Sequence, residues 1–138
     1  MKNSFAVLRQ QHIDIQAGLK RVYDASMGET NTGRQDLCAV RDMLFNHFNF
    51  EESELYVALK TYAETDQILK RLLESFDEEK VQLIETMLEF FGAYDGSEVT
   101  CFRFARDFGR LQHLVSTRFR REETRLFTYL PRKTVKSR

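Results

Sequence analysis

The feature that most constrains this chain is the spacing of its apolar residues, which recur every three or four positions through four long stretches. This spacing places apolar side chains along one face of a helix, whereas a strand would need strict alternation. The 138 residues include one proline and six glycines, too few for the many turns of a sandwich or a barrel. The sequence therefore predicts an all-α protein, in one domain spanning residues 1–138.

Each apolar stretch follows a residue that can cap a helix and ends at a break in the pattern. The stretches cover residues 5–22, 37–62, 69–91 and 104–129. The cap candidates are Ser4, Thr32, Thr65 or Asp66, and Ser97, and Pro131 marks the final stop. Because short connections between long helices favour antiparallel neighbours, we expect an up-down-up-down four-helix bundle.

Two further properties bear on where the protein works. No apolar run approaches the ~20 residues that a membrane span needs, and the first residues lack the apolar core of a signal peptide. We therefore expect a cytoplasmic protein without a membrane partner. Cys38 and Cys101 are far apart in helix-like segments, so we expect two reduced thiols and not a disulfide.

Acidic and basic residues are unevenly distributed, although the formal net charge is zero. Residues 48–100 hold 13 acidic and 4 basic side chains, and residues 101–138 hold 11 basic and 3 acidic ones. Neighbouring helices of a bundle usually satisfy such an asymmetry between them, so nucleic acid is not the favoured partner. A basic surface that docks an acidic protein is the alternative, and a dimer stays open.

Ionisable residues interrupt each apolar stretch near its middle, where the helical period calls for an apolar side chain. They are His12, His47, Glu51, Glu79, Arg118 and Glu122. Burying such groups costs several kcal/mol each unless they are paired or coordinated. We therefore expect them to converge in one layer that is satisfied mutually or by a metal. His113 is out of phase with this layer and is expected to face solvent.

The spacing of His47 and Glu51 points to a cation. Four residues apart, the two side chains lie on one helical face and can reach the same ion. Inward-facing carboxylates and histidines from facing helices are how bundles build di-iron and di-manganese centres. A single pair at this spacing is usually a surface contact, but His12, Glu79 and Glu122 are in phase with it. Together these five residues are the candidate metal ligands.

A family resemblance rests on two similar turns. The segment His47-Phe-Asn-Phe-Glu-Glu-Ser-Glu-Leu-Tyr56 is echoed by Arg118-Phe-Arg-Arg-Glu-Glu-Thr-Arg-Leu-Phe127. Both resemble the signature of the hemerythrin-like (HHE) family. The resemblance spans the chain and implies a four-helix bundle that holds non-heme iron, mono- or di-iron, usually as an oxo-bridged pair. It places His12, His47, Glu51 and Glu122 at ligand positions.

The sequence departs from this family at two positions. The histidine of the third helix is missing, and Glu79, or its competitor Glu78, is the candidate from helical phase alone. The histidine of the fourth helix is replaced by Arg118, which cannot bind a metal. Two alternatives follow: Arg118 fills the site and no metal binds, or Arg118 turns away and leaves a two-histidine, three-glutamate site for iron or manganese.

The sequence also resembles a second family, and this resemblance is consistent with both departures. The regulator-of-sigma-D anti-sigma proteins are similar in His47-Phe48, in Arg118-Phe-Arg-Arg-Glu-Glu123, in Phe108-Gly109 and in Arg9-Gln-Gln. It implies a metal-free regulatory protein that binds a sigma factor or another protein partner. The leading hypothesis is a metal-binding protein that senses oxygen, nitric oxide or iron. Neither hypothesis makes the chain an enzyme, because no nucleophile and base pair or phosphate loop is present.

Overall fold

The structure is a computed structural model that describes residues 2–28, 33–94 and 102–128. Those residues form helices and turns without a strand, so the all-α prediction is confirmed. The elements are α1 (Lys2–Ser26), α2 (Gly33–Phe50), the π-helix η1 (Glu51–Tyr56), α3 (Val57–Ala63), α4 (Gln67–Tyr94), α5 (Phe102–Arg121) and the π-helix η2 (Glu122–Leu126). None of these helices combines the length and the apolar character needed to cross a membrane.

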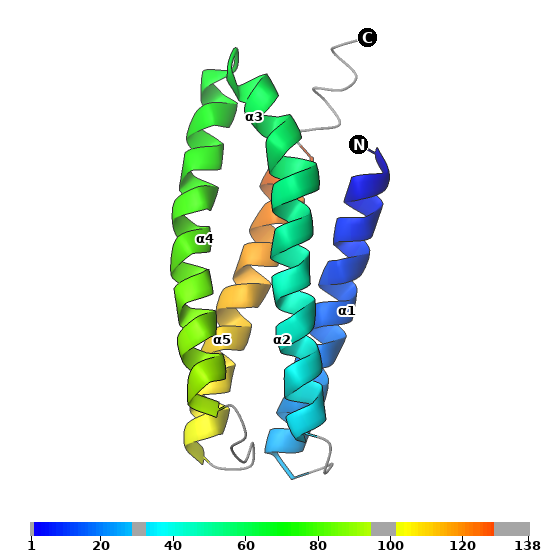
Figure 1. The fold of residues 1–138 in the computed structure, drawn as a ribbon, viewed down its shortest axis with the longest axis vertical. Helices are drawn as coiled ribbons and strands as arrows, with labels where there is room; N and C mark the ends of the chain where they lie inside the picture. Colours follow the sequence, from blue (N-terminus) through cyan, green and yellow to red (C-terminus); the bar gives the residue numbers. More distant parts are fainter. Residues whose placement is uncertain (1, 29–32, 95–101, 129–138) are drawn as a thin grey trace.

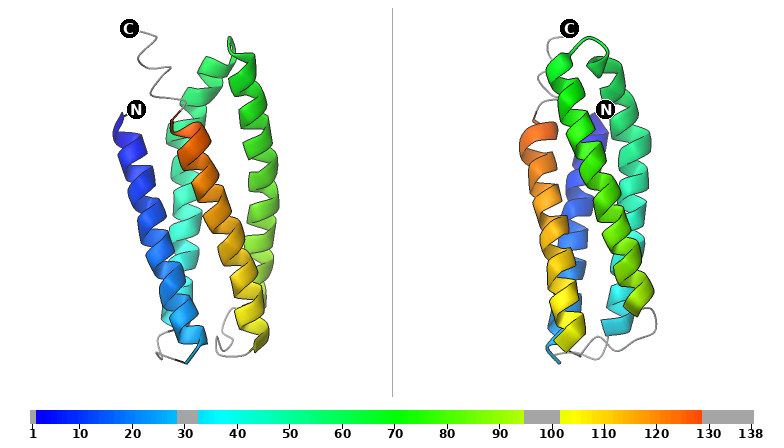
Figure 2. Two further views of the ribbon diagram at one scale, coloured as in Figure 1. Left: turned by 180° about the vertical axis from the view of Figure 1, so that it is seen from behind. Right: turned by 90° about the vertical axis from the view of Figure 1, so that its left-hand side faces the viewer.

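The elements join into four long rods that alternate in direction (Figure 1). The elements α2, η1 and α3 follow one another as one rod, and η2 continues α5. Helix α1 packs against α2 and α5, and α4 packs against α3 and α5. Seen from behind, α1 and α5 stand side by side in front of α2 (Figure 2). The predicted antiparallel four-helix bundle is thus confirmed.

Some helix ends lie where the sequence predicts them, and others do not. The Asp66 Oδ1 accepts a 3.0 Å hydrogen bond from the Leu69 amide, so Asp66 caps α4 as predicted. Gly28 follows α1 with φ of +80°, the left-handed conformation that suits glycine. The prediction for Ser4 was wrong, because α1 begins at Lys2. The third apolar stretch ended at residue 91, but α4 continues through Gly92 to Tyr94.

Some predicted features lie outside the described residues. They are the caps at Thr32 and Ser97, the thiol of Cys101, the apolar Tyr129 and the stop at Pro131. Within the described part of the chain, Cys38 is a free and half-buried thiol. His113 is exposed, as its helical phase predicted.

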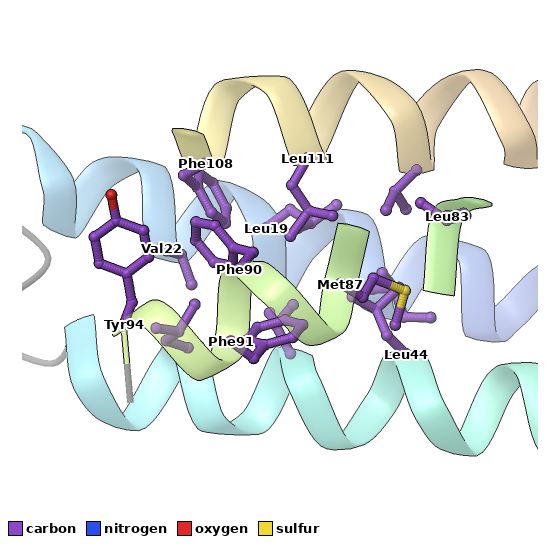
Figure 3. Close-up of a cluster of buried hydrophobic side chains, with 14 of the residues drawn as sticks. Leu19, Val22, Leu44, Leu83, Met87, Phe90, Phe91, Tyr94, Phe108 and Leu111 are labelled. Carbon is purple, nitrogen blue, oxygen red and sulfur yellow. The ribbon is translucent and has the colours of Figure 1, made fainter. Parts of the chain in front are cut away.

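The apolar core is divided into two clusters along the bundle. The larger cluster lies toward the α1–α2 turn and contains Leu19, Leu44, Met87 and Phe108 (Figure 3). The smaller cluster lies at the other end and contains Leu8, Leu55, Phe76, Leu126 and Phe127. The buried polar side chains His12, His47, Glu51, Arg118 and Glu122 belong to neither cluster.

The π-helix η1 shifts the helical phase of everything that follows it. A constant helical period through the stretch of residues 37–62 places Ala58 and Tyr62 in the core, but both are only partly buried. Leu59 and Ala63, one position later, are buried instead. A π-turn inserts one additional residue, and this moves the apolar face by one position. A constant helical period therefore fails after Glu51.

Gly18 allows α1 and α2 to approach closely. A Cβ atom at this position would lie 2.7 Å from Val40 Cγ2 and 2.8 Å from Met43 Cε. The space is therefore already filled by α2 side chains, and a larger residue would push the helices apart.

We predict that Gly18→Val lowers the free energy of unfolding by roughly 1–3 kcal/mol, because it overpacks this contact. The matched control is Gly109→Val, since Gly109 is exposed in α5 and nothing lies within 4 Å of its added Cβ. The control is expected to change stability by less than about 0.5 kcal/mol. Urea denaturation of both variants measures the difference, and equal effects would contradict the close approach.

Candidate metal centre

Four buried side chains from four elements meet between the two apolar clusters. They are His12 of α1, His47 of α2, Glu51 at the first position of η1 and Glu122 at the first position of η2. One ligand atom from each residue lies within 4.8 Å of the others. Imidazole nitrogen and carboxylate oxygen are ligands for first-row transition metals. The group therefore has the composition and the spacing of a metal site.

The two glutamates occupy equivalent places in their rods. Each is the first residue of a π-helix, and in η2 the amide of Phe127 donates a 2.8 Å hydrogen bond to the carbonyl of Glu122, five residues earlier. The wider turn lets the adjacent residues that follow, Leu126 with Phe127 and Leu55 with Tyr56, all be buried. Single π-turns of this kind are frequent at functional sites.

His12 is oriented by two carboxylates. Its Nδ1 lies 2.8 Å from Oε2 of Glu123, and because a carboxylate only accepts, Nδ1 carries the donated proton. Its Nε2 lies 3.0 Å from Oε1 of Glu122. The His12 ring stacks on Phe119 with ring centroids 3.9 Å apart. This arrangement fixes the ring and turns Nε2 toward the other three ligand atoms.

His47 is oriented in the same way from the facing helix. Its Nδ1 donates a 2.7 Å hydrogen bond to the Oε1 of Gln11. Its Nε2 therefore faces the carboxylates, 3.0 Å from Oε2 of Glu51 and 3.8 Å from Oε1 of Glu122. Both histidines thus use Nδ1 for a supporting partner, and this leaves Nε2 directed at the group.

Three buried atoms of this group have no hydrogen bond. They are Nε2 of His47 and both carboxylate oxygens of Glu51. Nε2 and Oε2 are close enough for an ion pair, but their geometry does not meet the angular requirement of a hydrogen bond. Leaving buried polar atoms unsatisfied costs about 1–3 kcal/mol each, more for charged groups. A cation between the two histidines and the two glutamates would satisfy Nε2 of His47 and Oε2 of Glu51, the oxygen that faces the histidines.

Arg118 lies beside the four-residue group and points into the bundle. Its Nε donates a 3.1 Å hydrogen bond to Oε2 of Glu122, its Nη1 donates to the carbonyl of Phe76 at 2.7 Å, and its Nη2 donates to the Tyr56 hydroxyl at 2.9 Å. The guanidinium also lies over the Phe76 ring, 4.7 Å from its centroid. Of the two alternatives, Arg118 therefore does not turn away, and it leaves the histidine side of the carboxylates to other groups.

The structure does not bring Glu79 into the group with the two histidines. Glu79 is 36% exposed, is paired with Arg121 and lies 3.9 Å from Nη1 of Arg118. Its competitor Glu78 is exposed. Helical phase placed Glu79 on the inner side of α4, but the arginines of the basic last helix hold its carboxylate at the rim.

Burial and neighbouring charges shift the pKa values of the group in opposite directions. Burial lowers the pKa of His47, but the Glu122 and Glu51 carboxylates outweigh it and raise that pKa to about 9. Burial and the negative charge of Glu122 raise the pKa of Glu51 to about 8. Burial favours a higher pKa for Glu122 as well, but both histidines hold it well below its ordinary range. Without a metal, Glu122 is the carboxylate that stays ionised.

Sequence reasoning missed three residues that support the group: Gln11, Glu123 and Tyr56. Gln11 and Glu123 are direct neighbours of ligand candidates, and a helical period assigns such neighbours to another face. Tyr56 follows Glu51 by five positions, the spacing of a π-turn. The repeated pair of large side chains, Leu55-Tyr56 and Leu126-Phe127, was the signal that could have revealed it.

Comparison with protein families gives a match to the hemerythrin HHE cation binding domain over residues 3–130. This chain belongs to that family. A comparison with curated proteins and one with solved structures gave no match. The hemerythrin HHE domain is a cation-binding fold, and in this member the described residues supply a buried His/Glu group that could hold a metal.

We predict that the metal-free hemerythrin HHE domain loses stability as the pH rises from about 4.5, the ordinary pKa of Glu51, to about 9, the folded pKa of His47. The folded pKa values of His47, about 9, and Glu51, about 8, lie above their ordinary values of 6.5 and 4.5. The folded protein therefore binds these protons more tightly than the unfolded chain, and raising the pH favours unfolding. Glu122, with its lowered pKa, contributes stability that is lost only when the pH falls below about 4.5.

Denaturation midpoints of chelator-treated protein between pH 5 and pH 9 measure this dependence. Glu51→Gln removes one of the two titrating groups, so it is expected to flatten the decline. A midpoint that rises steadily over the same range would contradict the assignment of these protons.

Proposed function

We propose that this chain is a non-heme iron binding protein that holds the metal through His12, His47, Glu51 and Glu122. The observation that supports this most is the pair of unsatisfied buried atoms, Nε2 of His47 and Oε2 of Glu51, beside two further ligand atoms. Two imidazoles and two carboxylates form a mixed nitrogen and oxygen donor set that suits iron, and manganese or zinc as competitors. The family match supports cation binding but does not specify the metal.

The surroundings of the group suit a metal that must be protected from water. Phe48, Phe76 and Phe119 are buried around it, and apolar clusters lie on both sides. Such a shell limits solvent access and sets the local dielectric. A groove of about 160 Å³ between α1 and α2 is lined by Gln11, Met43 and His47 among others, so His47 is the ligand candidate that lies beside an open groove.

Within this proposal the physiological role is sensing of dioxygen, nitric oxide or iron status. Bound iron would supply the affinity for a diatomic ligand at a coordination position that the four side chains do not fill. The protein groups contribute a fixed ligand geometry, a dry cavity and supporting hydrogen bonds. The described residues do not place a nucleophile with a base at the site, so binding and not turnover is the proposed activity.

The competing function is a metal-free regulatory protein that binds a sigma factor or another protein partner. It predicts that buried charges neutralise one another without a cation. Arg118 neutralises Glu122, since its Nε donates a hydrogen bond to Oε2 of that residue. Its Nη2, however, lies 3.7 Å from Oε1 of Glu51 and makes no hydrogen bond with it. The metal-binding proposal accounts for Nε2 of His47 and Oε2 of Glu51, and the competing one leaves both atoms unsatisfied.

Substitution of the proposed ligands tests the function directly. We predict that His47→Ala and Glu51→Gln reduce the metal content to background, measured by elemental analysis of protein purified without chelator. His113→Ala is the matched control, because His113 is an exposed histidine and is expected to leave the metal content unchanged. Wild-type protein that takes up no iron when reconstituted anaerobically would favour the metal-free function.

Glu79 can be tested in the same assay. We predict that Glu79→Gln keeps the metal, since its carboxylate is paired with Arg121 at the rim. Loss of metal in this variant would instead make Glu79 a fifth ligand.

The residues that orient the two histidines are expected to affect the affinity for the metal without being essential for binding. We predict that Gln11→Ala and Glu123→Ala each weaken metal binding by roughly 10–100-fold, because each removes the acceptor that orients a histidine. Matched controls are Gln10→Ala and Glu52→Ala, whose side chains bond to Asp14 and to lysines instead. Competition with a chelator of known affinity measures the change, and equal losses in variants and controls would contradict the orienting role.

A further inference from the structure

The two buried glutamates each present one oxygen to the histidines and the other to Arg118. Glu122 Oε1 lies 3.0 Å from Nε2 of His12, while its Oε2 accepts a hydrogen bond from Nε of Arg118 at 3.1 Å. Glu51 Oε2 lies 3.0 Å from Nε2 of His47, while its Oε1 lies 3.7 Å from Nη2 of Arg118. The carboxylates therefore separate two positions for positive charge. The guanidinium occupies one, and the four candidate ligand atoms face the other.

We propose that Arg118 is a built-in second cation, which restricts the centre to one metal ion per chain. This inference rests on the proposed metal-binding function and deepens it. Two carboxylates that each offer two oxygens could otherwise bridge a pair of metal ions, the arrangement of two-metal sites in bundles. Here the oxygens on one side are already directed at a permanent positive charge.

The guanidinium is held too firmly to give way to a metal. Besides Glu122 it donates to the carbonyl of Phe76 and to the hydroxyl of Tyr56, so all three of its nitrogens have partners. Its side chain is 2% exposed and lies against the Phe76 ring. Moving it would break three hydrogen bonds and would require its charge to find another buried place.

Helix α4 offers no substitute ligands on the arginine side. The groups that it presents there are the Phe76 carbonyl, which accepts from Arg118, and the Glu79 carboxylate, which is paired with Arg121. A second metal ion on that side would therefore meet a fixed cation, and Oε1 of Glu51 is the buried oxygen there that has no hydrogen bond. The histidine side, in contrast, brings two imidazole nitrogens and two carboxylate oxygens within 4.8 Å of one another.

The test is the metal-to-protein ratio at saturation, with Mn(II) as the probe and native mass spectrometry as the readout. We expect a ratio of one for the wild-type chain. Arg118→His removes the fixed charge and adds a ligand four residues before Glu122, so we expect the ratio to rise to two. Arg121→His is the matched control: it adds the same side chain and also releases Glu79, but keeps Arg118, so we expect one.

Each outcome bears on one of the two claims. A wild-type ratio of two, or a ratio of one in a folded Arg118→His variant, would overturn the role of Arg118 while leaving metal binding intact. A ratio of zero in both the wild type and the Arg121→His control would overturn the proposed function, and the inference with it.

A second measurement does not depend on the folding of the variant. Electron paramagnetic resonance of the Mn(II)-saturated wild type distinguishes an isolated ion from a magnetically coupled pair. The signal of an isolated ion supports the inference, and that of a coupled pair overturns it. Arg118→Lys keeps a cation at this position and is expected to keep the isolated signal.

Discussion

The middle of this bundle must hold two carboxylates, two imidazoles and a guanidinium out of water, between two apolar clusters. Removing charges from water costs several kcal/mol each unless they are paired with good geometry. Hydrogen bonds from His12 and Arg118 satisfy Glu122, and Gln11 and Glu123 satisfy the outer nitrogens of the histidines. These bonds leave Nε2 of His47 and the carboxylate oxygens of Glu51 without a hydrogen bond. The proposed function is based on these atoms.

The two π-helices connect local backbone geometry to this arrangement. Each begins at a glutamate of the site and turns two adjacent large side chains inward directly after it. One of these side chains, Tyr56, accepts the hydrogen bond that anchors Arg118. The irregular turns therefore position both the candidate ligands and the fixed cation beside them. A regular α-helix would place Tyr56 on a different face, and Arg118 would lose this partner.

Much of this arrangement could be predicted from the sequence, because it depends on helical period. Four apolar stripes predicted the bundle, and the polar interruptions at His12, His47, Glu51 and Glu122 predicted residues that the structure brings together. The period failed where geometry departs from it: the core after Glu51 is displaced by one residue, toward Leu59 and Ala63. The helical period also failed to predict the partners of side chains that lie on the same inner face of a helix. Glu79 was in phase, but its pairing with Arg121 depends on the packing of two helices, which a single helical pattern does not contain.

A crystal structure of the iron-reconstituted protein, with anomalous scattering recorded at the iron edge, tests the central claim most directly. The account predicts one anomalous peak per chain, from an ion bound by the Nε2 atoms of His12 and His47 and by carboxylate oxygens of Glu51 and Glu122. The guanidinium of Arg118 should keep its bond to Glu122 beside that peak. An absence of any peak among these four residues, or a peak at another place in the bundle, would contradict the account.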